Sequence, residues 1–106
     1  MIEQPTLSTI KKIALGDGEF ENKLLSIIKR ELPEEIELYK QNCANKDYLL
    51  VAENVHKLNH KISILGLEEG ILKAVKFENE LRDGNCDLKK EFDELLEKMT
   101  RFLNDI

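Results

Sequence analysis

The sequence predicts an all-α fold, an up-down-up-down four-helix bundle with a short additional helix at the N-terminus. Composition is the first observation, since 42% of the 106 residues are hydrophobic and 35% are charged, whereas 6% are aromatic. Such a balance is typical of soluble helical proteins. The second observation is that apolar residues recur every three or four positions in four long stretches, which is the period of a helix with one buried face. Short turns separate these stretches, so successive helices should run antiparallel.

Length, charge and cysteine content bound the class of protein. A chain of 106 residues suits one hydrophobic core, so we expect residues 1–106 to form a single domain, either free-standing or within a longer protein. The net charge of −5 argues against nucleic-acid binding, because no basic stripe could neutralise phosphates. No apolar run approaches the ~20 residues that span a bilayer, and the N-terminus lacks the pattern of a signal peptide. Cys43 and Cys86 lack a C-x-x-C spacing, which favours reduced thiols. We therefore expect a cytoplasmic monomer without membrane contact.

The first predicted helix is short and the second is long. Thr6 is expected to cap the short helix, which Gly16 would end. Asp17 is placed to cap the long helix over residues 19–42. Pro33 lies inside this helix and should kink it, because proline removes a backbone donor. The acids around Pro33 are expected to form a solvated face: Glu31, Glu34, Glu35 and Glu37.

The third predicted helix, residues 48–65, contains both histidines of the protein. Asp47 is placed to cap it and Gly66 to end it. At about 100° of rotation per residue, one side collects an apolar stripe: Val51, Val55, Leu58, Ile62 and Leu65. On the same wheel His56 falls roughly 140° from the centre of the stripe, and His60 lies roughly opposite it. Both histidines should therefore face water or a partner.

Two further helices complete the predicted bundle. One covers residues 67–82, where Gly70 weakens the helix and suggests close packing. Its apolar positions are Ile71, Ala74, Val75 and Leu81. Asp87 is expected to cap the last helix, which continues to the C-terminus. The methionines and phenylalanines are expected to fill the core.

The two histidines are the candidates for chemistry, because the chain has no glycine-rich phosphate loop, H-E-x-x-H motif or nucleophile elbow. Their spacing allows them to share a metal ion, but a zinc site takes about four ligands and neither cysteine is suitably spaced. We therefore predict no metal site. Two ordinary exposed histidines are a second interpretation. A third is that neutral imidazole acts as a nucleophile near pH 7.

A docking surface beside His56 would favour the nucleophile. Leu49, Ala52 and Ile64 fall on or near the same exposed side, where a soluble helix normally carries polar groups. Apolar side chains around a reactive polar one are typical of a protein-binding surface. The alternative function is a helical interaction module that docks a partner protein through Leu49, Ala52 and Ile64 without chemistry.

His56 is followed by leucine two positions later, Leu58, and by Leu65-Gly66 nine and ten positions later, whereas no such spacing begins at His60. In this pattern the chain resembles the histidine-containing phosphotransfer (HPt) domain of bacterial two-component phosphorelays, which carries a histidine, a leucine and Leu-Gly at the same spacing. Weaker similarities extend over nearly the whole chain: Gly16-Asp17, Phe20, Leu32-Pro33, Phe77-Glu78, Leu81-Arg82 and Gly84.

The resemblance implies a role for each residue around His56. His56 would accept a phosphoryl group from the aspartyl phosphate of a receiver domain and pass it to another receiver. The partners would be receiver (response-regulator) domains and a hybrid histidine kinase. The HPt domain would have no cofactor and no kinase activity of its own, with Mg²⁺ bound by the receiver. Residues expected near the phosphoryl group are Asn59, His60, Lys57 and Ser63.

The chain departs from the family at two positions. Asn59 and His60 stand where the family has lysine and glycine. The amide of Asn59 can donate a hydrogen bond but carries no charge, so Lys57 or Lys61 would have to supply positive charge from a neighbouring position. His60 would either crowd the partner or contribute a second donor to the phosphoryl oxygens.

Overall fold

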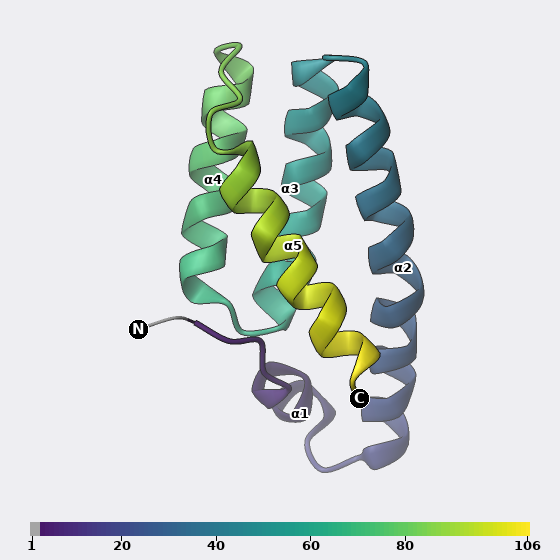
Figure 1. Cartoon of the computed structure of the whole chain (residues 1–106). Helices are drawn as coiled ribbons and strands as arrows, with labels where there is room; N and C mark the ends of the chain where they lie inside the picture. Colours follow the sequence, from purple (N-terminus) through teal and green to yellow (C-terminus); the bar gives the residue numbers. More distant parts are fainter. Residues whose placement is uncertain (1–2) are drawn as a thin grey trace.

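The computed structural model describes residues 3–106 and contains five α-helices and no strand within that range (Figure 1). The helices are α1 (Ser8–Ala14), α2 (Gly18–Ala44), α3 (Tyr48–Ile64), α4 (Glu68–Arg82) and α5 (Lys89–Asn104). The principal dimensions are 44 × 29 × 20 Å. The prediction of an all-α, bundle-like fold is confirmed.

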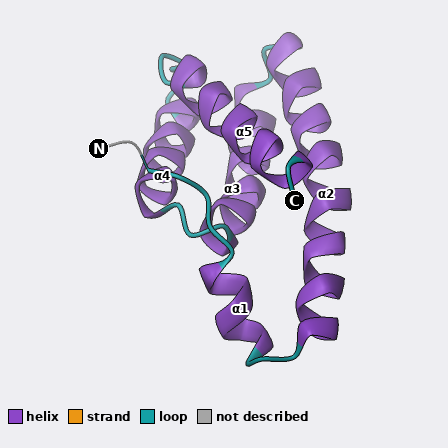
Figure 2. Cartoon of the chain, turned by 60° about the horizontal axis from the view of Figure 1, so that its bottom comes forward, coloured by secondary structure: helices purple, strands orange, loops and turns teal. Residues whose placement is uncertain are grey.

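The third helix is central to the packing. In Figure 1, α3 lies between α2 and α4, and it makes its most extensive contacts with α4. α5 runs obliquely across α2 and α4 (Figure 1), while α1 lies at one end of the bundle and leads by a short turn into α2 (Figure 2). Burial of one face of each long helix forms the core, whose largest members include Tyr39, Phe77, Phe92, Leu58, Ile62 and Met99.

Local capping explains where two of the helices begin. Asp17 accepts a hydrogen bond from the Phe20 amide at 3.1 Å, and Asp47 accepts one from the Leu50 amide at 3.3 Å. Both predicted caps are confirmed, because a carboxylate at this position satisfies a backbone donor that the helix leaves free. α2 then continues without interruption through Pro33 to Ala44.

Two other predicted caps are wrong. α1 begins after Leu7 and α5 after Leu88, and neither start has a side-chain cap. The Thr6 hydroxyl instead accepts from the Ser8 amide at 3.2 Å, one residue too early to cap the first turn. Asp87 lies in the preceding loop, where its own amide donates to Asn85.

The core differs from the predicted one at several apolar positions. Val75 and Phe20 are each 45% exposed, although helical spacing placed them with the core residues. Phe77 fills the α4 side of the core instead, with its ring centroid 5.2 Å from that of Phe92. Gly70 is tightly packed as predicted, since a Cβ there would meet Ile62 at 2.9 Å.

None of the helices described over residues 3–106 has the length and apolar character needed to cross a membrane.

Candidate functional site

α3 presents both histidines outward because its opposite face is buried. The whole predicted stripe (Val51, Val55, Leu58, Ile62 and Leu65) is at most 1% exposed. Burial of this stripe sets the rotation of the helix, so positions on the other side point to solvent. The side chain of His56 is 64% exposed, and His60 is also exposed. The predicted exposure of both histidines is confirmed.

A carboxylate from the neighbouring helix holds the ring of His56. Nδ1 of His56 lies 3.0 Å from Oε1 of Glu78 on α4. An ionised carboxylate can only accept hydrogen bonds, so Nδ1 is the donor and carries the hydrogen. In the neutral ring, Nε2 then holds the lone pair.

A second contact orients Glu78 itself. Its other oxygen, Oε2, accepts a hydrogen bond from Arg82 at 3.1 Å, one turn further along α4. The Glu78 side chain is only 17% exposed, whereas Arg82 is 47% exposed. His56, Glu78 and Arg82 therefore form a chain of three polar groups that runs from α3 onto α4.

Sequence reasoning assigned no role to Glu78 or Arg82. The weak family resemblance of Phe77-Glu78 and Leu81-Arg82 included both residues, and their spacing of four residues also favours an ion pair on a helix surface. Such pairs are common and do not indicate a partner on another helix. Only the packing of α4 beside α3 places Glu78 against His56.

His60 lies beside His56, one turn further along α3. The two ring centroids are 5.8 Å apart and the ring planes are inclined by 67°. Among residues 3–106, no group of three or more histidine, cysteine, aspartate or glutamate side chains is arranged to bind a metal ion.

The other predicted neighbours of the phosphoryl group occupy different environments. Lys57 and Ser63 are exposed, and Ser63 lies two turns after His56 on almost the same side of α3. Asn59 is half-buried, and its Oδ1 is buried without a hydrogen-bond partner. The amide of Asn59 is therefore partly withdrawn from the surface on which His56 lies.

Lys61 forms ion pairs with two acids on α2. Its Nζ lies 3.1 Å from Oε1 of Glu31 and 2.8 Å from Oε1 of Glu35, both on α2. The suggestion that Lys61 supplies charge beside His56 is wrong, because these two ion pairs hold its ammonium against α2. On the predicted solvated face of α2, Glu31 is 45% exposed and Glu35 is 24% exposed, and both also pair with Lys61.

The predicted docking surface is only partly exposed. Leu49 is 61% exposed and Ile64 is half-buried, but Ala52 is fully buried. The prediction that Ala52 is exposed is wrong. α4 packs closely against α3, and the short methyl side chain of Ala52 lies in the core. Val75, missed as a surface residue, lies one turn before Glu78 on α4 and is 45% exposed.

Comparisons with known proteins leave the site to be interpreted from its own geometry. A scan against protein-family models, a search of curated proteins and a search of solved structures each find no match to this chain.

Proposed function

We propose that the chain is an HPt-like phosphorelay intermediate that carries a phosphoryl group on Nε2 of His56. One observation carries the proposal: His56 is largely exposed on the central helix, and among residues 3–106 its ring is hydrogen-bonded through Nδ1 to Glu78 and not through Nε2. A nucleophile that must meet an aspartyl phosphate on another protein needs this combination of a held ring and an accessible nitrogen. The spacing from His56 to Leu65-Gly66 supports the same assignment.

The proposed reaction is an in-line transfer in each direction. The lone pair of Nε2 attacks the phosphorus of the receiver's aspartyl phosphate, and a nitrogen–phosphorus bond forms. The phosphorus–oxygen bond to the aspartate breaks, and the aspartate leaves as a carboxylate. Transfer to a second receiver reverses these steps. Mg²⁺ bound by the receiver stabilises the charge on the phosphoryl oxygens, so this chain supplies the nucleophile and its orientation.

The proposal also covers the arrangement of the helices, the oligomeric state and the partner proteins. The four long helices form an up-down-up-down bundle, as an HPt domain would. The domain acts as a cytoplasmic monomer on receiver domains, including that of a hybrid histidine kinase, and has no kinase activity or cofactor of its own. Residues 1–106 form one such domain.

The receiver would dock on apolar side chains around His56 that are exposed or half-buried. We assign Leu49 and Ile64 on α3 to this surface and add Val75 from α4, which replaces the buried Ala52. Leu49 lies two turns before His56 on almost the same side of the helix. Burial of such side chains around the reacting group would exclude water from the transfer.

Three polar neighbours would act on the phosphoryl group. The exposed Lys57 is the nearest lysine along α3 not paired with α2, and it would supply positive charge that Asn59 lacks. Ser63 would donate a hydroxyl at the far edge of the surface. His60, with its ring beside that of His56, would offer a second donor to the phosphoryl oxygens.

The experiment is phosphoryl transfer from a receiver. The protein is incubated with a phosphorylated receiver domain, and an acid-labile, alkali-stable label is measured on wild type, His56→Gln and His60→Gln. We expect label on wild type and on His60→Gln but none on His56→Gln. Label lost in His60→Gln and retained in His56→Gln would show that His60, and not His56, carries the phosphoryl group. Binding to receivers without any label would favour the interaction module that docks through the same apolar surface.

A further inference from the structure

We infer that Cys43 and Cys86 form a modification site, an oxidisable pair that a small disulfide such as oxidised glutathione converts into a reversible intramolecular disulfide. The two residues are the only cysteines of the chain, and both are half-buried free thiols. Cys43 lies in the last turn of α2, and Cys86 lies in the loop between α4 and α5. Figure 1 shows that this loop and the turn from α2 to α3 lie at the same end of the bundle.

Two contacts hold the segments that carry these cysteines against each other. Sγ of Cys86 lies 3.6 Å from the hydroxyl oxygen of Tyr48, the first residue of α3. Tyr39, one turn before Cys43 on α2, donates a hydrogen bond to Asp93 of α5 at 2.7 Å. Cys43 thus lies between two tyrosines along the chain, and these contact Cys86 itself and the helix that follows it. The fold therefore gathers both thiols in one region, which favours reaction between them over reaction with another molecule.

The charges around Cys43 support this proximity. Burial is the largest cause of the raised pKa of its thiol, Lys89 opposes the rise, and the charges of Asp93 and Cys86 add to it. Lys89 precedes Asp93 by one turn of α5, and its ammonium lies 2.6 Å from the carboxylate. A raised pKa leaves less of the thiolate, which is the attacking form. Cys43 therefore takes the second, intramolecular step of the reaction, and Cys86 takes the first.

The reaction consists of two successive thiol–disulfide exchanges. The thiolate of Cys86 attacks one sulfur of oxidised glutathione, a sulfur–sulfur bond forms, and one glutathione leaves as its thiolate. The thiolate of Cys43 then attacks the sulfur of Cys86, which forms the protein disulfide and releases the second glutathione. The two protein thiols are oxidised, glutathione disulfide is reduced to two glutathione molecules, and an added dithiol reverses both steps. Exposed residues on both sides of Cys86 leave the loop free to bring the sulfurs together.

Peptide mapping locates the disulfide. The folded chain is equilibrated with oxidised and reduced glutathione, and the remaining thiols are alkylated. Trypsin then releases Cys43 within residues 41–46 and Cys86 within residues 83–89. We expect a cross-linked peptide that contains both segments and that disappears after treatment with dithiothreitol. Cross-linked dimers, or glutathione attached to a cysteine without the internal disulfide, would overturn the inference, as would the absence of any reaction.

Cys43→Ser and Cys86→Ser are matched controls, since each keeps one thiol, and circular dichroism establishes that their helices are retained. Neither should give the cross-linked peptide. In wild type, oxidation should raise the Tm by about 10 °C, because the disulfide closes a long segment that contains α3 and α4. The same redox buffer should leave the Tm of both variants unchanged. A disulfide that lowers the Tm of wild type, or does not change it, would overturn the inference. None of these measurements depends on phosphoryl transfer by His56.

Discussion

His56 and His60 differ at the scale of the single residue in what surrounds each ring. Both are exposed on α3, but His56 is hydrogen-bonded through Nδ1 to a carboxylate. Helical periodicity was sufficient to predict their exposure, because the buried stripe lies on the other side of the helix. It could not predict Glu78, since that contact joins residues 22 positions apart on different helices.

Gly70 provides a prediction at the same scale. Alanine normally stabilises a helix interior by about 1 kcal/mol relative to glycine. Here a Cβ would lie 2.9 Å from Ile62 and 3.2 Å from both Leu67 and Leu95, all buried. Overpacking typically costs 1–3 kcal/mol, so we expect Gly70→Ala to lower the free energy of unfolding by about 1 kcal/mol in urea denaturation.

Gly18→Ala is the control for Gly70→Ala. Nothing lies within 4 Å of a Cβ at Gly18, which begins α2. This variant should be as stable as wild type or slightly more stable. A Gly70→Ala protein more stable than wild type would contradict the packing described between α3, α4 and α5.

The attachment of one helix to the next depends on polar contacts that helical patterns do not reveal. Lys61 joins α3 to α2 through Glu31 and Glu35, and its side chain is only 14% exposed. Tyr39 joins α2 to α5, because its hydroxyl donates to Oδ1 of Asp93 at 2.7 Å. The pKa of the Tyr39 phenol is raised above its ordinary value. Burial of the hydroxyl is the larger cause, and the hydrogen bond to Asp93 is the second.

Lys61→Met tests the link between α2 and α3. Glu31 is 45% exposed and Glu35 is 24% exposed, so water screens the pairs and we expect a loss of about 1–2 kcal/mol in the free energy of unfolding at pH 8. The exposed pair of Arg101 and Glu97 is the control, with N and O atoms 3.6 Å apart, and Arg101→Met should have almost no effect.

The stability difference between wild type and Lys61→Met should also depend on pH. Burial by itself lowers the pKa of Lys61, but the pairs with Glu35 and Glu31 outweigh it and raise the pKa above its ordinary value. A raised pKa stabilises the folded state fully below the unfolded pKa, about 10.4 for lysine, and this stabilisation is lost as pH rises through the folded pKa. The advantage of wild type should therefore shrink above about pH 10.4. An advantage that grows at alkaline pH would contradict the pairing.

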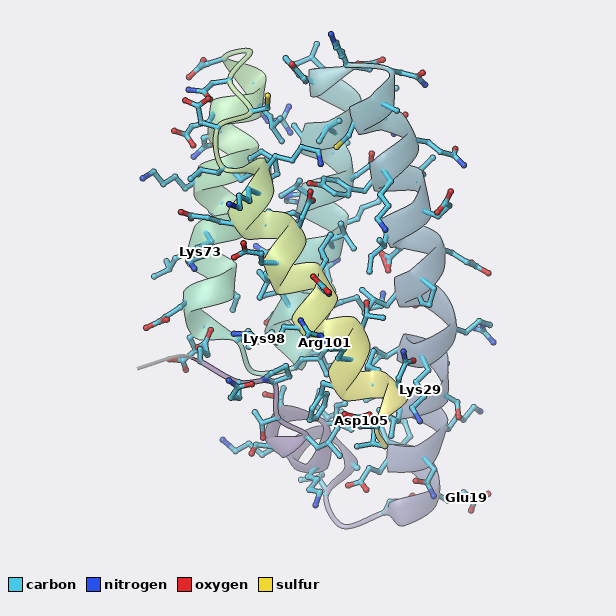
Figure 3. All side chains as sticks on the ribbon, in the orientation of Figure 1. Glu19, Lys29, Lys73, Lys98, Arg101 and Asp105 are labelled. Atoms are coloured by element: carbon cyan, nitrogen blue, oxygen red, sulfur yellow. The ribbon has the colours of Figure 1, made fainter. Side chains whose placement is uncertain are left out.

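At the scale of the whole molecule, residues 3–7, which precede α1, pass across one end of the other helices (Figure 1). The Glu3 carboxylate accepts hydrogen bonds from the amides of Glu69 and Gly70 at 3.0 and 3.1 Å, where α4 has no side-chain cap of its own. Lys98 on α5, labelled in Figure 3, donates to the carbonyl of Glu3 at 2.8 Å. The amide of Thr6 donates to the carbonyl of Leu65 at 2.8 Å. One segment thus connects α3, α4 and α5.

Glu3→Ala tests this connection. A carboxylate that caps a helix contributes about 1 kcal/mol, and we expect the free energy of unfolding to fall by that amount in urea denaturation. Gln4→Ala, at the exposed neighbouring position, should have little effect. Equal stability of the two variants would show that Glu3 does not cap α4 in solution.

The helices, two of their caps and the outward direction of His56 and His60 follow from local sequence. Each depends on residues within a few positions of one another, so period and capping chemistry are sufficient. The burial of Ala52, the pairing of Lys61 with α2 and the contact of Glu78 with His56 follow only from the packing of the folded chain. These outcomes depend on which helix lies beside α3 and how closely it packs, because contacts between distant residues require the chain to be folded first.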